Sequence, residues 1–349
     1  MSKKALLVGI NYLKSNKYRL SSPINDINIV RDFLIHYCNF QRDDIIMLSD
    51  SPKIKEAGSF FNITKYLKSF GDLDKDDFLF IYFSGHKSRY IDNDKKVKDE
   101  IFLPQDWNIN QLTSDYLKNY LLKYNCRTFV MFDCCNAKVD CKFKYNYNAK
   151  KMELVENLKL NNEKNDIILL TSGGINSNSY ETFLENNLIN NEKNKFYGEL
   201  TIFFLQILKN YLEIKLTFTD LKYENLVELI NEYLFELEEN NNKTVSYILK
   251  HNILKNTNII PYISMSNKKS IKNKFFYNSK NDENEELEEQ NTLNVLKRKT
   301  VTSLSYKYLR LKRKHDYILK INNNLEERNN KLLTIVSGNL KYNFGMVNR

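Results

Sequence analysis

The stretch FLFIYFSGHKSR, residues 78–89, decides the fold class of this chain. Its first half is an apolar run without alternating polar residues, which is typical of a strand that is buried on both faces of a parallel sheet. Its second half is a turn of small residues that presents one histidine, His86. Ligands of open α/β sheets bind beyond the carboxyl ends of the strands, so a histidine at this point indicates a functional site.

The chain repeats this pattern of apolar runs separated by helical segments. Further strands are expected at residues 5–10, 44–49, 128–133, 166–172 and 258–264. Apolar residues at helical spacing predict helices at residues 22–37, 62–70, 114–124, 198–212 and 219–238. The alternation predicts an α/β fold in which helices flank a mostly parallel central sheet as a three-layer sandwich.

The composition indicates a soluble protein of a reducing compartment. The chain has 349 residues, of which 42% are hydrophobic, so it can bury a large core. Its five cysteines are odd in number and form no CxxC pair, which argues against a disulfide framework and a structural zinc site. We recognise no signal peptide and no apolar stretch of membrane-spanning length, so we expect a cytoplasmic protein without a membrane partner.

The formal net charge of +10 is distributed along the sequence rather than gathered in one place. Lys residues are interspersed with Asn, Asp and Glu, whereas a nucleic-acid interface needs basic residues on one face. The densest basic cluster, residues 307–314, contains few aromatic residues that could stack on bases. We therefore do not expect nucleic acid as a partner.

Two composition changes divide the chain. Residues 1–264 are expected to form the α/β domain, within which the Lys-, Asn- and Tyr-rich residues 140–165 are expected to be a long exposed loop. Residues 265–349 are a charged extension that is either helical or disordered and that could contact another protein. Its heptad positions are Leu304, Leu311, Ile318, Leu325 and Leu332 on one seam and Tyr308, His315, Asn322, Asn329 and Val336 on the other. This half-polar pattern is compatible with a coiled coil or with a single solvated helix.

A cysteine and a histidine are expected at the same edge of the sheet. The strand at 128–133 is followed by Cys134 and Cys135, and His86 lies about 50 residues upstream, a separation found in caspases. A thiol is mostly protonated at neutral pH, so a cysteine peptidase needs an imidazole beside it. A cysteine at a strand end can also be a small buried hydrophobe, but the strand order and spacing together favour a Cys–His pair.

The ordered motifs of the first two thirds of the chain resemble those of the metacaspases, a family of caspase-related cysteine peptidases. The matching stretches are KALLVGINY, INDINIVRDFLI, IIMLSD, DFLFIYFSGHKS, DEIFLPQDW, TFVMFDCCNAK and ILLTSG, in this order over roughly residues 3–210. The resemblance implies a caspase-like fold and a domain that acts on proteins or peptides. It implies that His86 is the base, that Cys135 is the nucleophile and that Cys134 packs inward.

The resemblance also implies cleavage after Arg or Lys. The pocket for the basic side chain would be lined by Asp26, Ser84 and Asp133. Two carboxylates and a hydroxyl suit a cationic side chain. Taken alone, Asp26 could equally be a first-turn carboxylate that stabilises its own helix.

Calcium activation is a further implication of the resemblance, and self-processing is a hypothesis that the expected loop and pocket suggest. The residues that match the family's calcium ligands are Asp99, Asp115 and Asp140, and oxygen ligands suit Ca²⁺. The expected loop at 140–165 contains Lys150 and Lys151, where an enzyme that cleaves after Lys could cut itself. The catalytic domain is expected to be a monomer.

Three departures from the family pattern leave a second interpretation open. Lys87 replaces a glycine after the histidine, where a positive φ would strain any other residue. Asn136-Ala137-Lys138 replaces a flexible small-residue turn after the cysteine, and Glu181 follows a segment that lacks the family's acidic character. The alternative to an active peptidase is therefore a catalytically impaired pseudo-metacaspase that acts as a scaffold or regulator.

Overall fold

The computed structural model describes residues 2–91, 97–134, 143–148, 153–157, 165–172, 181–186, 193–215, 226, 229 and 262–267. The chain divides into two compact units, Met1–Asn278 and Ser279–Arg349. All of the described residues belong to the first unit, so the predicted heptad lies outside them. The predicted helix at 219–238 also lies outside them, apart from Leu226 and Leu229.

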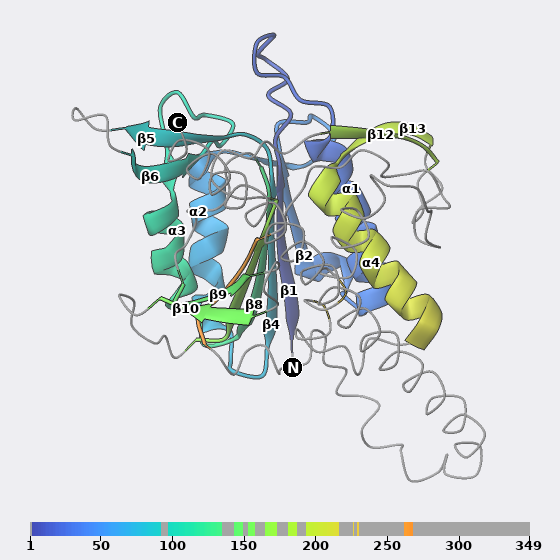
Figure 1. The fold of residues 1–349 in the computed structure, drawn as a ribbon. Helices are drawn as coiled ribbons and strands as arrows, with labels where there is room; N and C mark the ends of the chain where they lie inside the picture. Colours follow the sequence, from blue (N-terminus) through green and yellow to red (C-terminus); the bar gives the residue numbers. More distant parts are fainter. Residues whose placement is uncertain are drawn as a thin grey trace, which may run out of the picture. The chain divides into compact units, whose positions relative to one another are not determined.

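A nine-stranded sheet forms the centre of the first unit (Figure 1). Its strands, in spatial order, are β10 (Glu153–Glu156), β9 (Tyr145–Asn148), β14 (Tyr262–Met265), β11 (Ile167–Thr171), β8 (Arg127–Asp133), β4 (Phe78–Ser84), β1 (Lys3–Gly9), β2 (Ile45–Ser49) and β3 (Glu56–Ala57). The strands from β11 to β3 are parallel, and β14, β9 and β10 add antiparallel pairs at one edge. The predicted α/β fold with a mostly parallel sheet is confirmed.

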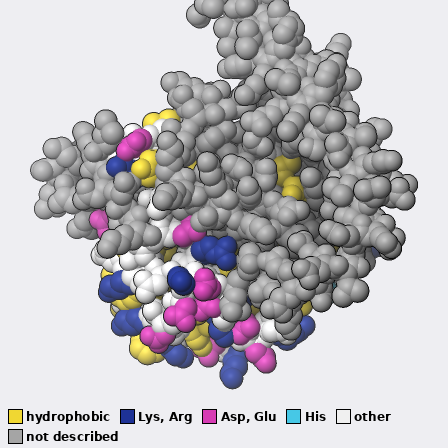
Figure 2. All heavy atoms as spheres, turned by 90° about the horizontal axis from the view of Figure 1, so that it is seen from below, with side chains coloured by type: hydrophobic (Ala, Val, Ile, Leu, Met, Phe, Trp, Pro, Cys, Tyr) yellow, Lys and Arg dark blue, Asp and Glu magenta, His cyan; other side chains and the backbone are white. Residues whose placement is uncertain are grey.

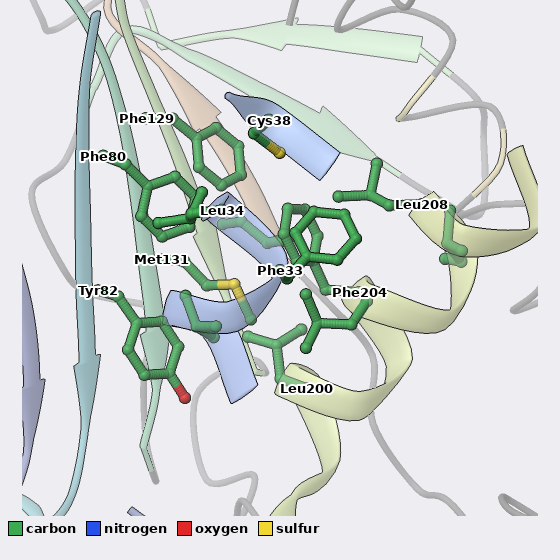
Figure 3. Packing of buried hydrophobic residues seen from close by; sticks show 14 of the residues in the cluster. Phe33, Leu34, Cys38, Phe80, Tyr82, Phe129, Met131, Leu200, Phe204 and Leu208 are labelled. Atoms are coloured by element: carbon green, nitrogen blue, oxygen red, sulfur yellow. The ribbon is translucent and has the colours of Figure 1, made fainter. Parts of the chain in front are cut away.

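Among the described residues, four helices cover the two faces of this sheet. They are α1 (Pro23–Cys38), α2 (Phe60–Ser69), α3 (Ser114–Leu121) and α4 (Glu199–Lys215). Figure 1 shows α1 and α4 on one face and α2 and α3 on the other. All seven residues of β4 are buried, and the six that precede Ser84 alternate between two apolar cores. Phe80 and Tyr82 pack with Phe33 and Phe204 on the α1–α4 face (Figure 3), which explains why this strand is apolar throughout.

Two small sheets lie beyond the carboxyl ends of the parallel strands (Figure 1). One consists of β5 (Lys87–Ile91), β6 (Val97–Phe102) and β7 (Leu112–Thr113), and the other of β12 (Glu181–Asn186) and β13 (Lys193–Gly198). Short 3₁₀ turns occur at Arg42–Asp44 and Phe70–Asp72. The sequence did not predict these small sheets, because most of their strands carry charged and polar residues in place of a continuous apolar run. They place further side chains at the edge where the site was expected.

The prediction of a long loop over residues 140–165 is wrong. The described residues of this segment form β9 and β10, which pair antiparallel with each other. Their Lys-, Asn- and Tyr-rich composition hid the strands, because these lie at a sheet edge and need fewer apolar residues. Lys150 and Lys151 lie outside the described residues, so self-processing at these lysines stays a prediction.

The surface of the described residues carries charges of both signs. On the face at the amino ends of the parallel strands, Figure 2 shows Lys and Arg side chains intermingled with Asp and Glu. That face therefore does not present the single-sign surface that nucleic acid requires. Within the described part of the chain, no helix has the length and apolar character needed to cross a membrane.

Candidate active site

The ends of three neighbouring strands bring the predicted residues together. Ser84, the last residue of β4, is in register with Gly9 of β1 and with Asp133 of β8. His86 follows two residues later. The intervening Gly85 packs closely, since a Cβ at this position would lie 3.1 Å from Tyr12 Oη and 3.3 Å from the Phe83 ring. The turn therefore needs a glycine so that His86 can lie against Tyr12.

The ring of His86 is fixed by one hydrogen bond and two aromatic neighbours. Its Nε2 lies 2.8 Å from the carbonyl oxygen of Tyr18. A carbonyl only accepts hydrogen bonds, so Nε2 carries the proton and Nδ1 keeps the lone pair of the neutral ring. The Tyr12 ring lies 4.8 Å from the imidazole between centroids, and Tyr18 approaches it edge-on at 6.2 Å. The orientation of the imidazole and its tautomer are thus both determined.

Tyr12 also connects the backbone of His86 to the β6 side of the site. Its hydroxyl accepts a hydrogen bond from the amide of His86 at 2.9 Å and donates one to the carbonyl of Leu103 at 2.7 Å. Burial raises the pKa of Tyr12, so the hydroxyl stays protonated and can keep donating. Tyr12 is therefore a positioning residue for the histidine, which sequence reasoning missed.

The environment of His86 favours the neutral imidazole. Burial lowers the pKa of His86 below its ordinary value, and the Tyr18 carbonyl and the Glu181 carboxylate oppose this shift without reversing it. A neutral imidazole with a free nitrogen is the form that can accept a proton. The environment thus keeps the His86 ring neutral, with Nδ1 able to accept a proton.

Asp26 points into the molecule from the first turn of α1. Its side chain is fully buried, with 0% exposure. It accepts hydrogen bonds from Ser84 Oγ on Oδ2 and from the amide of Gly198 on Oδ1, both at 2.8 Å. Burial raises the pKa of Asp26 well above its usual range, and the neighbouring Asp133 raises it further. A carboxylate placed only to stabilise its helix would remain in solvent, so helix stabilisation alone does not account for the position of Asp26.

Asp133 lies beside Asp26 and is held by the start of α4. Its Oδ2 accepts hydrogen bonds from the amide of Thr201 at 2.9 Å and from the Thr201 hydroxyl at 2.8 Å. The segment packs so tightly that a Cβ on Gly198 would lie 2.2 Å from Asp133 Oδ2. Residues 198–201 therefore connect the two carboxylates. The sequence placed these residues at the start of a predicted helix and did not indicate that they reach the site.

Lys87 does not carry the backbone strain that its sequence position suggested. It is the first residue of β5, paired with Phe102, and it does not have a positive φ. Its side chain is buried, with Nζ 5.4 Å from the centre of the Phe102 ring. The turn between β4 and β5 is made at Gly85. Lys87 in place of the family's glycine is therefore not an argument against a working site.

Of the two cysteines that follow β8, the structure describes Cys134 but not Cys135. Cys134 is 1% exposed and packs in the apolar core on the α2–α3 face, as predicted. Cys135 and the Asn136-Ala137-Lys138 turn lie outside the described residues. The nucleophile therefore stays a prediction, and it directly follows a residue whose position is known.

The three residues expected to bind calcium do not form a site within the described residues. Asp115 is an exposed residue in the first turn of α3. Asp99 pairs with Tyr90 between β6 and β5, and Asp140 lies outside the described residues. Across the described ranges, no three His, Cys, Asp or Glu side chains are grouped as metal ligands. Calcium binding stays a prediction, and no catalytic role is derived from it.

Glu181 has a definite partner that the sequence could not reveal. Its Oε1 accepts hydrogen bonds from the amides of Ser21 at 2.8 Å and Ser22 at 2.6 Å. These amides lie between Tyr18 and the start of α1. Glu181 thus attaches the β12–β13 hairpin to the segment that holds His86.

Comparisons with known proteins agree with this geometry. Residues 3–141 match the family described as metacaspase, peptidase C14 domain. Metacaspase-1 of Lodderomyces elongisporus is 31% identical over 164 residues, which cover 42% of this chain and 36% of that protein. Metacaspase-6 of Arabidopsis thaliana is 32% identical over 146 residues, covering 39% of this chain and 38% of that protein. The matches thus span less than half of the length of these relatives.

A solved structure supports the fold alone. A crystal structure of a Geobacter sulfurreducens protein matches with a TM-score of 0.50 and 16% sequence identity, covering 79% of this chain and 99% of that one. The resemblance predicted from the motifs is confirmed by the family match.

Proposed function

We propose that this chain, whose residues 3–141 match the metacaspase peptidase C14 domain, is a cysteine endopeptidase that cleaves after Arg or Lys. The observation that carries the proposal is the buried pair Asp26 and Asp133, at 0% and 4% exposure, at the sheet edge that also presents His86. Two neighbouring buried carboxylates are unfavourable as charges unless a proton or a cation neutralises them. An Arg or Lys side chain of a substrate supplies that cation, and the Ser84 hydroxyl completes the polar lining.

The reaction assigns one role to each nitrogen of His86. Nε2–H stays on the Tyr18 carbonyl, which leaves Nδ1 to take the proton from the Cys135 thiol. The thiolate attacks the carbonyl carbon of the scissile bond, and His86 then protonates the leaving amine. Water hydrolyses the resulting thioester, giving its proton to His86 and releasing the acid product and the thiol.

The tetrahedral intermediate requires backbone N–H donors near the nucleophile. The amide of His86 is not one of them, because it donates to Tyr12 Oη. The donors in this proposal are the amides around Cys135. The role of the His86 backbone is instead to hold the imidazole at a fixed distance from the end of β4.

One assay tests the proposal. Fluorogenic peptides ending in Arg, Lys or Asp are offered to the wild-type protein with and without calcium, beside Cys135→Ala and the matched control Cys134→Ala. We expect cleavage of the Arg and Lys peptides only, abolished in Cys135→Ala and retained in a folded Cys134→Ala. Absence of cleavage under every condition would favour the pseudo-metacaspase. A requirement for calcium would support metal binding through Asp99, Asp115 and Asp140.

Self-processing is tested separately. The proposal expects cleavage after Lys150 or Lys151 when the wild-type protein is incubated alone, and none in Cys135→Ala. Sequencing the new N-terminus identifies the site. A wild-type chain that stays intact while it cleaves peptides would exclude self-processing without affecting the peptidase.

A further inference from the structure

A third carboxylate lies next to the buried pair and has no role in the proposal so far. Glu199 is the first residue of α4, between Gly198, whose amide binds Asp26, and Thr201, which binds Asp133. Its side chain is 6% exposed. It therefore belongs to the same buried segment that connects the two aspartates.

The two carboxylate oxygens of Glu199 differ in their hydrogen bonds. Oε1 accepts a hydrogen bond from Thr182 Oγ1 of β12 at 3.3 Å. Oε2 is buried, and no donor from the described residues reaches it. Burial raises the pKa of Glu199 to about 7, and Asp133 adds to this effect while Thr182 opposes it. A buried carboxylate oxygen without a donor is unfavourable, which indicates that a donor other than the described residues completes the site.

Helix stabilisation does not explain this arrangement. A glutamate in the first turn of a helix interacts favourably with the helix dipole. That interaction requires no burial and no hydrogen bond to a neighbouring hairpin, whereas Glu199 has both. The position next to Asp133 also adds repulsion between two carboxylates, which helix capping alone would not favour.

The missing donor is better supplied by an organic cation than by a metal ion. Across the described residues, Asp26, Asp133 and Glu199 do not converge closely enough to form a metal-ligand group. A guanidinium is planar, carries five N–H donors on separate edges, and can bind carboxylates that lie apart. An ammonium is a compact charge with three donors, which Asp26, Asp133 and Ser84 are sufficient to bind.

We propose that Glu199 is a third carboxylate of the substrate pocket and that its free Oε2 accepts a hydrogen bond from the guanidinium of arginine, favouring arginine over lysine. This inference rests on the proposed peptidase function and adds to it the residue that discriminates between the two basic side chains. Lysine reaches the aspartates without Glu199, and arginine gains one charge-assisted hydrogen bond from it.

The test is a comparison of peptides that differ only in Arg or Lys at the cleavage site. Glu199→Gln keeps the shape of the side chain and an oxygen that can accept from Thr182, but removes the charge. We expect kcat/KM for the Arg peptide to fall about tenfold, from the loss of a hydrogen bond to a charged group. For the Lys peptide we expect a fall of less than about threefold, because its ammonium binds the aspartates. Glu156→Gln on β10, at the far edge of the sheet, is the matched control and should change neither value.

Three results would overturn the inference. An Arg-to-Lys ratio that is unchanged in Glu199→Gln, with both peptides cleaved, contradicts the role of Glu199 and leaves the peptidase intact. If Glu199→Gln does not fold, as judged by circular dichroism, Glu199→Asp replaces it, and an unchanged ratio has the same meaning. If the wild-type protein cleaves neither peptide and Cys135→Ala binds neither in a fluorescence anisotropy titration, the proposed function itself fails and this inference fails with it.

Discussion

The histidine and the buried carboxylates of the candidate site are held by different kinds of interaction. His86 is partly exposed and is held by a backbone carbonyl, that of Tyr18, and by the ring and hydroxyl of Tyr12. Asp26 and Asp133 are buried and are held by hydrogen-bond donors at the start of α4. The first region fixes the direction of a neutral ring. The second keeps charges out of water.

Because the two regions are held differently, mutations in them should have different effects on activity and stability. Removing a hydrogen bond or ring neighbour of His86 should lower the rate of the chemical step, because the ring moves relative to the nucleophile. Removing a charge from the carboxylates should weaken substrate binding and also stabilise the free protein, because burial penalises the charge. Variants of the two regions should therefore change activity and stability in different combinations.

The largest effect is expected from Asp133→Asn. The amide keeps the size of the side chain and an oxygen for Thr201, but removes a buried charge that faces the substrate cation. We expect kcat/KM for Arg and Lys peptides to fall by at least about a hundredfold. The free energy of unfolding at pH 8 should be unchanged or higher, because one of two neighbouring buried carboxylates is neutralised. Peptide kinetics and urea unfolding measure the two quantities.

The matched control for this variant is Asp44→Asn. Asp44 makes an ion pair with Lys4 at 2.6 Å, partly exposed to solvent and at the opposite ends of the strands. Its loss should leave peptide cleavage unchanged and alter stability by less than about 1 kcal/mol. Asp133→Asn with full activity would contradict the pocket. Asp133→Asn that is clearly less stable than the wild type would contradict the view that this carboxylate destabilises the free protein.

Tyr12→Phe should have a smaller effect on activity than Asp133→Asn. It should lower the rate of the chemical step rather than substrate binding. It removes the hydrogen bonds to the His86 amide and the Leu103 carbonyl but leaves the aromatic ring beside the imidazole. We expect kcat to fall about tenfold with KM nearly unchanged, and stability to fall by about 1–2 kcal/mol. The ratio of activities on Arg and Lys peptides should stay constant. A change in that ratio would show that the two regions of the site are not separable.

The two regions also differ in how much of them the sequence could predict. The end of β4 was predicted correctly at Ser84, because an apolar run followed by a glycine marks the end of a buried strand. Parallel pairing then places Ser84, Asp133 and His86 at one edge, and the family motifs added Asp26. These predictions depended on side-chain identity and on the order of the strands. Both can be inferred from the amino-acid sequence.

The supporting interactions could not be predicted in this way. The Tyr18 carbonyl acts through the backbone, which has no signature in the sequence. The chain returns to the sheet edge through β13 and α4, which brings Gly198, Glu199 and Thr201 to the site. The strand β13 was too polar to be recognised in the sequence. The positions of backbone groups, and contacts between segments far apart in the sequence, depend on the tertiary structure. The groups that position a site are therefore harder to predict than its reactive residues.

A dependence of stability on pH tests the buried charges without any substrate. Burial raises the pKa of Glu199 from 4.5 to about 7, so folding favours its protonated form. Its favourable contribution is complete below pH 4.5 and is lost as the pH rises through 7. Relative to Glu199→Gln, the wild type should therefore lose about 3 kcal/mol of unfolding free energy between pH 4.5 and pH 8. Urea unfolding of both proteins at several pH values measures this difference, and parallel curves would contradict it.

The smallest effect on activity is expected from Lys87→Gly, which restores the glycine of the family pattern. Lys87 lies in β5 without a positive φ, and its ammonium faces the Phe102 ring, so glycine relieves no strain there. Glycine in a strand and the absence of the cation–π interaction together should lower stability by about 1–2 kcal/mol. Because the hydrogen bonds of the His86 ring and amide do not involve the Lys87 side chain, we expect kcat/KM to change by less than about threefold. A tenfold gain in kcat would show that this lysine restrains the histidine, and the histidine region would then depend on a buried charge as the carboxylate region does.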